Sequence, residues 1–241
     1  MREASGTRVP ALAVVIPVFD EQESLQTLHR ELDAALGGID GGVELLFVDD
    51  GSRDDSPAVL RELAKKDPRV RLVCLDGHHG QSAALDAGFR AVRAPITASL
   101  DADLQNDPAD IPALLACLDH ADVVNGVRVR RRDSPVRIVS SRIANAVRNR
   151  LTGGSVSDVG CSLRVMRTHY LRRVKLYRGL HRFLPTLLAL EGARVIEIPV
   201  SHRPRRYGRS KYGIRDRLFV GLFDLAAVCW MKRRAFRYRV L

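Results

Sequence analysis

The sequence predicts an α/β fold in which helices flank a central, mostly parallel sheet of the Rossmann type. Short, continuous apolar runs alternate with longer segments of helical spacing through the first part of the chain, as expected for strands buried on both faces. Acidic side chains directly follow several of these runs. The 241 residues are 46% hydrophobic, which allows a sizeable core and argues against disorder.

Four apolar runs are the predicted strands of this first part. The first of them, 11–18, is a continuous apolar run, which favours a strand covered on both sides. The predicted strands are 11–18, 43–48, 70–75 and 96–100. Between them, apolar residues recur with the spacing of amphipathic helices. The predicted helices are 21–36, 56–66 and 81–92.

The pattern changes in the second part of the chain, where arginines become frequent and the alternation is less regular. We expect strands at 122–127, 158–166 and 194–200, and a helix at 135–151. A basic loop is expected at 128–133 and a loop rich in Arg, Gly and Pro at 201–212. Acids therefore gather in the first half and arginines in the second. This asymmetry suits a metal-bound donor on one side of a site and an anionic acceptor on the other.

The composition restricts the partners and the compartment. The formal net charge of +11 indicates an anionic partner, which the sign alone leaves as nucleic acid, a phosphate-bearing substrate or an acidic membrane face. The four cysteines lie far apart without a CxxC pair, so we expect buried free thiols and a reducing cytoplasm. The polar N-terminus has no apolar signal-peptide core.

The C-terminal segment contains the longest apolar stretch, residues 218–231. It is shorter than the ~18 apolar residues that a membrane span needs, and Asp224 interrupts it. Basic residues flank it, so it is either an interfacial helix or a helix docked on the domain. We therefore divide the chain into an N-terminal tail (1–10), one catalytic domain (11–212) and a C-terminal amphipathic or apolar helix with a basic tail (213–241).

Acidic clusters follow the carboxyl ends of the predicted strands, where open α/β sheets bind their ligands. Asp101 and Asp103 stand at alternate positions after the fourth strand, so their carboxylates point the same way on extended chain. Such a pair suits Mg²⁺ or Mn²⁺, which complete their coordination with phosphate oxygens, and Gln105 follows at the same spacing. A metal here would stabilise a leaving diphosphate. Asp49 and the following residues either bind a nucleotide or form a turn and helix cap.

Taken together and in this order, the motifs resemble a known family. Residues 15–21 (VIPVFDE) and 49–54 (DDGSRD) are similar to the "IPVYNE" and "DDGSTD" motifs of inverting, nucleotide-sugar-dependent glycosyltransferases with the GT-A fold. Residues 100–105 (LDADLQ) resemble the subgroup that acts on polyprenyl phosphates, the dolichyl-phosphate mannosyltransferases and undecaprenyl-phosphate sugar transferases. Residues 158–164 and 202–212 match later motifs of that subgroup, so the resemblance extends over most of the chain.

The resemblance implies a role for each matching residue. The nucleotide-sugar would be bound by Pro17, Phe19, Glu21, Asp49, Asp101, Ala102 and Asp103. The cation, Mg²⁺ or Mn²⁺, would be held by Asp101, Asp103 and Gln105. The acceptor phosphate would be bound by Arg128, Arg137, Ser141, Arg205 and Lys211. The residues expected to act in catalysis are Asp101, Asp103 and Arg128.

The implied reaction is a single displacement in which the acceptor phosphate attacks the anomeric carbon and the configuration inverts. The implied partners are a UDP- or GDP-linked sugar, a polyprenyl-phosphate lipid and a membrane surface, with room for a membrane-protein partner. The expected location is peripheral, on the cytoplasmic face of the membrane. Phe19, Asp20 and His78 depart from the residues usual in the family, and these departures leave the nucleotide and the sugar open.

Three other functions remain open. A family member whose acceptor is a sugar hydroxyl would need a general base, for which Asp158 is the candidate. A nucleic-acid-binding module would account for the charge, but aromatic residues are only 5% of the chain and the acids at the strand ends would repel phosphates. The intact Asp-x-Asp motif argues against a catalytically inactive scaffold.

Overall fold

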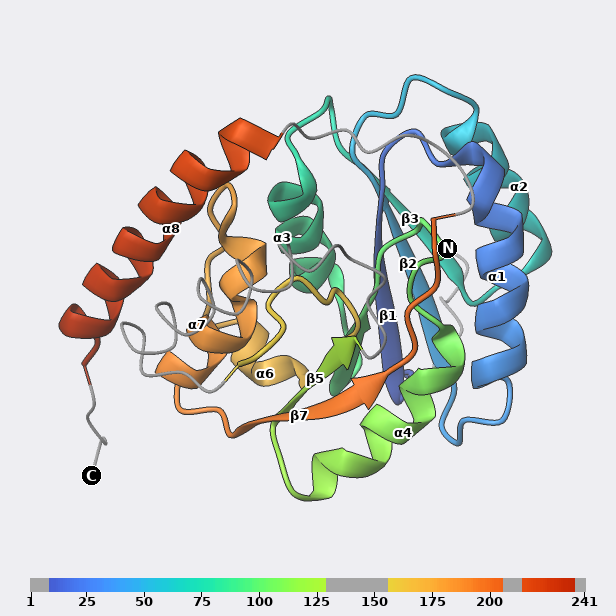
Figure 1. The fold of residues 1–241 in the computed structure, drawn as a ribbon. Coiled ribbons are helices and arrows are strands. Elements are labelled where there is room, and N and C mark those ends of the chain that lie inside the picture. The colour runs from blue at the N-terminus through green and yellow to red at the C-terminus, as the bar shows by residue number, and fades with distance from the viewer. Residues whose placement is uncertain (1–8, 129–155, 206–213, 237–241) are drawn as a thin grey trace, which may run out of the picture.

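A computed structural model describes residues 9–128, 156–205 and 214–236. These residues form a seven-stranded sheet covered by helices on both faces (Figure 1). The predicted helix at 135–151, with Arg137 and Ser141, lies outside the described residues, and so does Lys211.

The sheet has the strand order β3-β2-β1-β4-β6-β5-β7. The strands are β1 (Leu12–Val18), β2 (Val43–Asp49), β3 (Val70–Cys74), β4 (Ile96–Ser99), β5 (Val123–Arg128), β6 (Arg164–Arg167) and β7 (Val195–Val200). Strands β3, β2, β1 and β4 pair in parallel, as β5 and β7 do. Only β6 runs antiparallel to both of its neighbours, β4 and β5, among the strands described. The sheet is therefore mostly parallel, as the sequence predicts.

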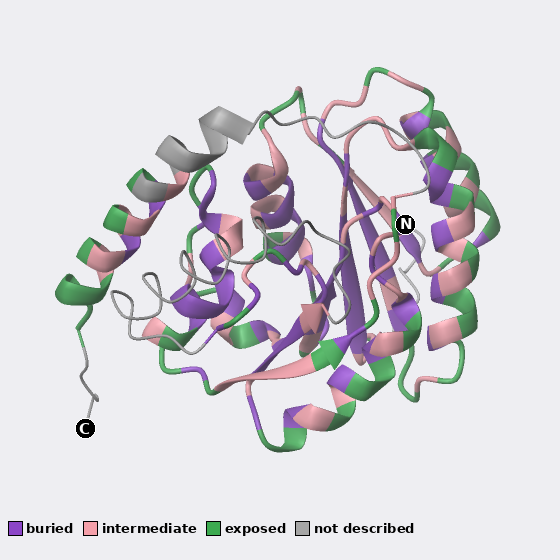
Figure 2. Cartoon of the chain, viewed as in Figure 1, coloured by how far each residue is buried: buried purple, intermediate pink, exposed green. Residues whose placement is uncertain are grey.

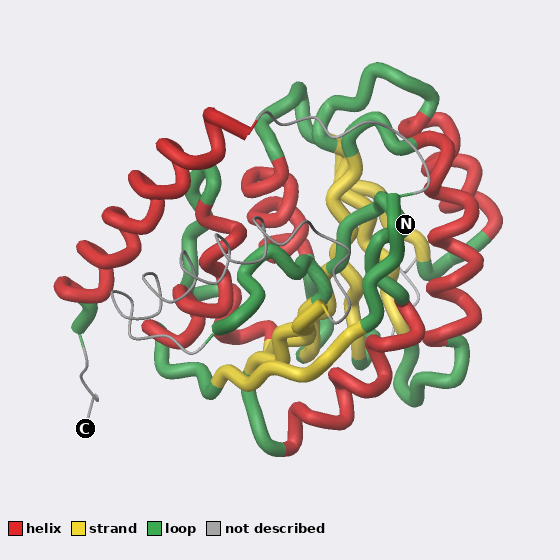
Figure 3. Tube along the Cα trace, in the orientation of Figure 1, coloured by secondary structure: helices red, strands yellow, loops and turns green. Residues whose placement is uncertain are grey.

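Helices complete two hydrophobic layers, one on each face of the sheet. The first face is covered by α1 (Gln22–Leu36), α2 (Ser56–Lys66) and α4 (Ile111–Ala116). The second is covered by α3 (Gln81–Ala91), α6 (Thr168–Leu171) and α7 (Leu184–Leu190), with α8 (Ile214–Arg234) outside them. Short 3-10 turns lie at Pro108–Asp110 (η1), Cys117–Asp119 (η2) and Leu180–Phe183 (η3). Figure 3 shows the strands as a central layer between the helices.

Strand β1 shows why the sheet is central. Val14 and Ile16 pack in the first layer, whereas Ala13 and Val15 pack in the second. All four side chains are fully buried, because successive residues of a strand point to opposite faces. Figure 2 shows the same buried strands between helices that have one exposed face. A strand buried in this way needs apolar residues at every position, as its sequence has.

One predicted strand was wrong in extent. Residues 158–166 were expected to form it, but β6 covers only Arg164–Arg167. Asp158 instead closes a turn: its side chain accepts a hydrogen bond from Gly160 N at 3.2 Å, and its carbonyl accepts one from Cys161 N at 3.4 Å. These N–H groups are therefore used within the turn and are unavailable to a strand ladder.

Helix α8 packs against the second layer through Val228, which is fully buried. Among the residues that the structure describes, no helix is long and apolar enough to cross a membrane. The two positions that the sequence allowed for this helix, docked and interfacial, are therefore not exclusive, because docking covers one face only.

Candidate active site

A cavity of about 440 Å³ opens beside the carboxyl ends of β1 and β4. It brings together most of the residues that the sequence assigned to the donor and the metal. Of the predicted site residues, those lining this cavity are Pro17, Phe19, Glu21, Asp101, Ala102, Asp103, Gln105 and Arg205. Glu21 and Asp103 come from loops far apart in the chain, and the sheet brings them to one edge.

The two loops that carry these acids turn sharply. Asp20 (φ 50°) and Leu104 (φ 62°) both adopt left-handed backbone conformations, which few non-glycine residues do. Tertiary contacts maintain them: Ser52 Oγ accepts a hydrogen bond from Asp20 N at 3.0 Å, and Leu104 is buried in the core. Such backbone outliers cluster at functional sites, where the surrounding structure fixes them.

Asp101 and Asp103 form a pair of interacting carboxylates. Burial, followed by the charge of Asp103, raises the pKa of Asp101 to about 6. Gln81 Nε2 donates a hydrogen bond to Asp101 Oδ1 at 2.6 Å. Arg205 Nη2 lies 3.1 Å from both Asp103 Oδ2 and Glu21 Oε1. The positive charge of Arg205 therefore compensates the negative charges of these two carboxylates.

The donor set at this position suits a hard cation. Carboxylate oxygens of Asp101 and Asp103, with the amide oxygen of Gln105, are the kind of ligand that Mg²⁺ and Mn²⁺ prefer. Within the described part of the chain, no three His, Cys, Asp or Glu side chains form a cluster that could hold a metal alone. A cation here therefore needs further oxygens, which a diphosphate has. A bound cation would also favour the charged form of Asp101.

A second cavity of about 350 Å³ adjoins the first and shares Gln81 and Asp101 with it. Its wall carries three arginines, Arg128, Arg164 and Arg182. The pKa of the Arg128 guanidinium is raised: burial acts to lower it, but the hydrogen bond and the charge of Asp158 outweigh that effect. An acidic cavity and a basic cavity therefore meet at Asp101.

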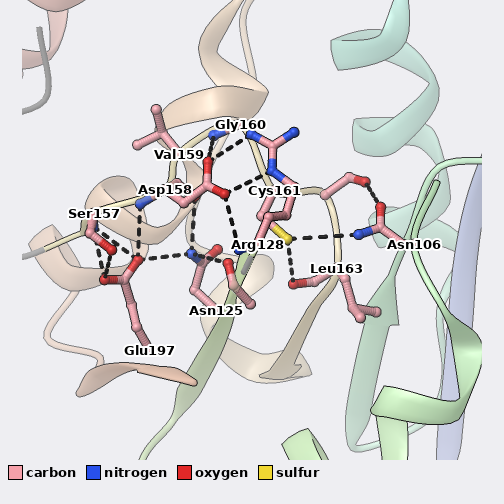
Figure 4. Close-up of polar contacts among 12 residues, drawn as sticks. Asn106, Asn125, Arg128, Ser157, Asp158, Val159, Gly160, Cys161, Leu163 and Glu197 are labelled. Atoms are coloured by element: carbon pink, nitrogen blue, oxygen red, sulfur yellow. Dashed lines mark hydrogen bonds and ion pairs between the residues drawn. The ribbon is translucent and has the colours of Figure 1, made fainter. Parts of the chain in front are cut away.

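Asp158 holds Arg128 in a bidentate ion pair (Figure 4). Arg128 Nε and Nη2 donate to the two carboxylate oxygens at 2.7 and 2.8 Å, and Arg128 N donates to Oδ2 at 3.2 Å. The Gly160 N–H also donates to this carboxylate, at 3.2 Å. Asp158 is thus occupied in orienting Arg128, which argues against its use as a general base.

Glu197 on β7 fixes the turn that contains Asp158 (Figure 4). Its carboxylate accepts from Ser157 N at 2.8 Å, from Ser157 Oγ at 2.7 Å and from Asn125 Nδ2 at 3.2 Å. Asn125 lies on β5, three residues before Arg128 of the second cavity wall, and is fully buried. The last strand therefore positions the basic side of the site.

Two donor-side features differ from the sequence-based assignment. Asp49 is buried and does not line either cavity; its Oδ1 accepts from Ser52 N at 3.3 Å, as expected for the turn interpretation. Asp50 lines the first cavity in its place. His78 Nδ1 lies 2.8 Å from Asp50 Oδ2, and its ring stacks on Phe19 with centroids 3.8 Å apart. The stacked pair forms a flat wall of the cavity.

Three further site residues were not assigned from the sequence. Gln81 is the first residue of α3 and separates the two cavities. His181 and Arg182 come from η3 and line the second cavity. Burial, followed by the charges of Arg182 and Arg164, lowers the pKa of His181 to about 3. Arg205 lies on the acidic side of the site, whereas Arg128 lies on the basic side.

Comparison with known proteins gives consistent results. The model of the glycosyl transferase family 2 matches residues 13–175. The undecaprenyl-phosphate 4-deoxy-4-formamido-L-arabinose transferase of Edwardsiella ictaluri is 40% identical over 216 residues, 89% of this chain and 66% of that protein. The protein of the same name from Klebsiella pneumoniae subsp. pneumoniae is 41% identical over 219 residues, 90% of this chain and 67% of that protein. The chain thus spans about two thirds of the length of these relatives.

Solved structures share the fold. Glucosyl-3-phosphoglycerate synthase from Mycobacterium tuberculosis, in complex with Mn²⁺, UDP and glucosyl-3-phosphoglycerate, superposes with a TM-score of 0.66. The match covers 95% of this chain and 81% of that chain at 17% identity. A complex of the same enzyme with Mg²⁺ and UDP gives a TM-score of 0.67 at 18% identity. At such low identity the likeness establishes the fold alone, a mixed α/β fold of the GT-A type.

Proposed function

Because the chain belongs to glycosyl transferase family 2, we propose that it transfers a sugar from a nucleoside-diphosphate sugar to a polyprenyl phosphate, with inversion at the anomeric carbon. One observation carries this proposal: an acidic cavity and an arginine-lined cavity meet at Asp101. A metal-bound diphosphate suits the first and a phosphate monoester suits the second. The relatives' names, which specify undecaprenyl phosphate and an amino-sugar derivative, support the acceptor class.

The donor would occupy the first cavity. Asp101, Asp103 and Gln105 would hold Mg²⁺ or Mn²⁺, and the bound cation would stabilise the charge that develops on the leaving nucleoside diphosphate. Pro17, Glu21 and Ala102 would contact the nucleotide-sugar. Asp50 and the Phe19–His78 stack would contact its base or ribose, since a flat aromatic wall suits a planar ring.

The acceptor phosphate would occupy the second cavity, where Arg128 is already oriented by Asp158. A phosphate monoester carries about −1.5 to −2 charges at neutral pH and is itself a nucleophile, so its alignment matters more than a strong base. Arginine suits this role because its planar fork binds phosphate oxygens in pairs. We include Arg137, Ser141 and Lys211 in the proposed acceptor site on the strength of the sequence motifs. Arg205, which lines the first cavity, would contact the acceptor phosphate from the donor side.

A hydroxyl acceptor is the second candidate, and the engaged state of Asp158 argues against it. A polyprenyl-phosphate acceptor lies in a bilayer, so the proposed enzyme works at a membrane surface. We propose a peripheral position on the cytoplasmic face, alone or with a membrane-protein partner.

A transfer assay tests the proposal. The protein is incubated with Mn²⁺ and labelled UDP- or GDP-sugars, and with either undecaprenyl phosphate in detergent or free oligosaccharide. We expect label in the lipid only, no transfer after chelation of the metal, and none with Asp103→Ala. The same panel of nucleotides should raise the melting temperature only with Mn²⁺, because a ligand of the folded state stabilises it. Label in the oligosaccharide, or full activity of Asp103→Ala, would contradict the proposal.

A further inference from the structure

The first turn of α3 connects the two cavities of the candidate site. Gln81 and Ser82 are its first two residues, and each holds a side chain of a cavity wall. Gln81 Nε2 donates to Asp101 Oδ1, and both cavities share this acid. Ser82 Oγ lies 2.7 Å from Nδ1 of His181, which lines the second cavity. The same turn therefore fixes a carboxylate of the donor side and an imidazole of the basic side.

The hydrogen bonds of the Ser82 hydroxyl determine the tautomer of His181. Ser82 is 5% exposed, and its oxygen accepts a hydrogen bond from Gly179 N at 3.0 Å. Among the described residues, the acceptor within reach of the Ser82 O–H is His181 Nδ1. If Nδ1 instead donated to Ser82, the buried O–H would be left without an acceptor, which is costly. Ser82 therefore donates to Nδ1, and the imidazole carries its hydrogen on Nε2.

The other ring nitrogen, Nε2, faces the second cavity. Because Nδ1 is directed at Ser82, Nε2 lies on the far side of the ring. It pairs with no described residue, and solvent reaches it from the cavity. The backbone of His181 is also anchored, since Arg164 Nη1 donates to its carbonyl at 3.1 Å. The cavity wall thus presents an N–H donor in a defined position.

The imidazole is neutral at pH 7. Burial, followed by the charges of Arg182 and Arg164, lowers the pKa of His181 to about 3. These two arginines and Arg128 line the same cavity. Three guanidinium groups already supply attraction for an anion, so a neutral donor adds direction without a further charge. The wall therefore combines charged donors with a neutral one.

We propose that His181 Nε2–H donates a hydrogen bond to an oxygen of the acceptor phosphate, and that Ser82 is the positioning residue that fixes the required tautomer. This inference rests on the proposed function, because it needs a phosphate monoester in the second cavity. The hydrogen bond would hold one phosphate oxygen while the arginines hold others, which aligns the attacking oxygen. The proton stays on Nε2, so His181 transfers no proton in the reaction.

Nitrogen-15 NMR of the full chain tests the tautomer without turnover. Long-range proton–nitrogen spectra distinguish a protonated ring nitrogen from an unprotonated one, and the signals absent from His181→Gln identify His181. We expect a protonated Nε2 and an unprotonated Nδ1 from pH 8 to pH 5. Saturating geranyl phosphate should shift the Nε2–H signal, whereas geraniol should not. An Nδ1-protonated ring, or an Nε2–H signal that geranyl phosphate leaves unchanged, overturns the proposal.

Steady-state kinetics with undecaprenyl phosphate in detergent tests the contact itself. His181→Leu lacks the donor, so it should raise the acceptor KM about tenfold and leave the donor KM unchanged. His181→Gln can place an amide N–H near the position of Nε2 and should stay within about threefold of the parent. Ser82→Ala keeps the ring but releases its tautomer, so its acceptor KM should lie between those of the other two variants. An acceptor KM that is equal in the parent and His181→Leu overturns the proposal.

A matched control replaces a histidine elsewhere. His120 is exposed at the end of η2 and lines neither cavity, so His120→Leu should behave as the parent does. A purely structural role of His181 would alter the KM of donor and acceptor together, without recovery in His181→Gln, and would overturn the proposal. A fall of kcat in His181→Leu with an unchanged acceptor KM would indicate proton transfer by His181 and would overturn it as well.

The outcomes distinguish this inference from the function on which it rests. Transfer by the parent, with an unchanged acceptor KM in His181→Leu, would overturn the role of His181 and leave the proposed function supported. Absence of transfer with every UDP- and GDP-sugar, together with an Nε2–H signal that shifts with geranyl phosphate, would contradict the proposed function. The contact between His181 and a phosphate monoester would then remain supported.

Discussion

At the scale of single residues, the pairing of Arg128 with Asp158 decides between the two acceptor types. If Asp158 only orients Arg128, Asp158→Asn should raise the KM for the acceptor about tenfold or more and change kcat less, because binding rather than proton transfer is impaired. The pH dependence of kcat should stay as in the parent. Steady-state kinetics across a range of pH checks this.

Glu197→Gln is the matched control for that experiment, because it perturbs the same turn without touching the Arg128 pair. It should produce a smaller increase of the acceptor KM. A fall of kcat by ~100-fold or more in Asp158→Asn, together with the loss of a basic limb in the pH profile, would instead identify Asp158 as a general base for a hydroxyl acceptor.

His181 makes stability depend on pH. In the folded protein its pKa is lowered to about 3 by burial and by the nearby Arg182 and Arg164, and it lies 2.7 Å from Ser82 Oγ. The unfolded imidazole takes up a proton near pH 6.5, whereas the folded one does not. Stability is therefore unaffected above pH 6.5 and falls as the pH drops from there towards 3.

Urea unfolding at pH 7 and pH 5 measures this effect. The difference in the free energy of unfolding between the two pH values should be on the order of 1–2 kcal/mol larger in the parent than in His181→Gln, which cannot titrate. Contributions of the other acids cancel in this comparison. Equal pH dependence in the two proteins would mean that the folded imidazole titrates normally.

Some site residues could be predicted from the residues next to them in the sequence, whereas others could not. Phe19, Glu21 and Asp103 each lie within four residues of the carboxyl end of a strand, so the local pattern places them at the sheet edge. His181 reaches the site through a contact with Ser82, 99 positions away, and nothing in the neighbouring sequence indicates it. Asp49, the last residue of β2, and Asp50 are adjacent, and the sequence does not specify which of the two faces the cavity.

At the scale of elements, the packing of α3 on the sheet depends on one glycine. A Cβ at Gly88 would clash with Val15 Cγ1 and lie 3.0 Å from Val48 Cγ2, and both valines are fully buried. Gly88→Ala should therefore lower the free energy of unfolding by about 1–3 kcal/mol, despite the higher helix propensity of alanine.

Gly221→Ala in α8 is the matched control, because a Cβ there meets no atom within 4 Å. Propensity alone should then raise stability by about 0.5–1 kcal/mol. Denaturant unfolding of both variants measures whether each substitution lowers or raises the free energy of unfolding. A stabilising Gly88→Ala would show that α3 can move away from β1 at little cost.

The elements themselves were predicted to different degrees. The four predicted strands of the first half were confirmed, each to within one residue at either end, because apolar residues dominate each run. The antiparallel direction of β6 has no signature in four residues. The turn at Asp158 was mistaken for strand because its use of backbone N–H groups depends on a side chain whose rotamer the sequence does not specify.

At the scale of the whole molecule, one arginine links the two halves of the chain. Arg203, just after β7, donates from Nη1 to Glu31 of α1 at 2.8 Å, and its Nη2 pairs with Asp107. Its backbone N–H donates to Gln105 O at 2.9 Å. The segment that follows β7 thus contacts the loop that follows β4, and this contact brings Arg205 to Asp103.

A double-mutant cycle tests whether this link stabilises the fold. The side chains of Arg203 and Glu31 are only 29% and 26% exposed, so solvent screens their interaction less than that of a surface pair. We expect a coupling energy of about 1 kcal/mol between Arg203→Gln and Glu31→Gln in denaturant unfolding. Lys65 and Glu62, which are 70% and 57% exposed, provide the control pair and should couple by less than about 0.5 kcal/mol. If the two couplings are equal, the halves are held together by the sheet alone, and the position of Arg205 must depend on the ligand that it meets.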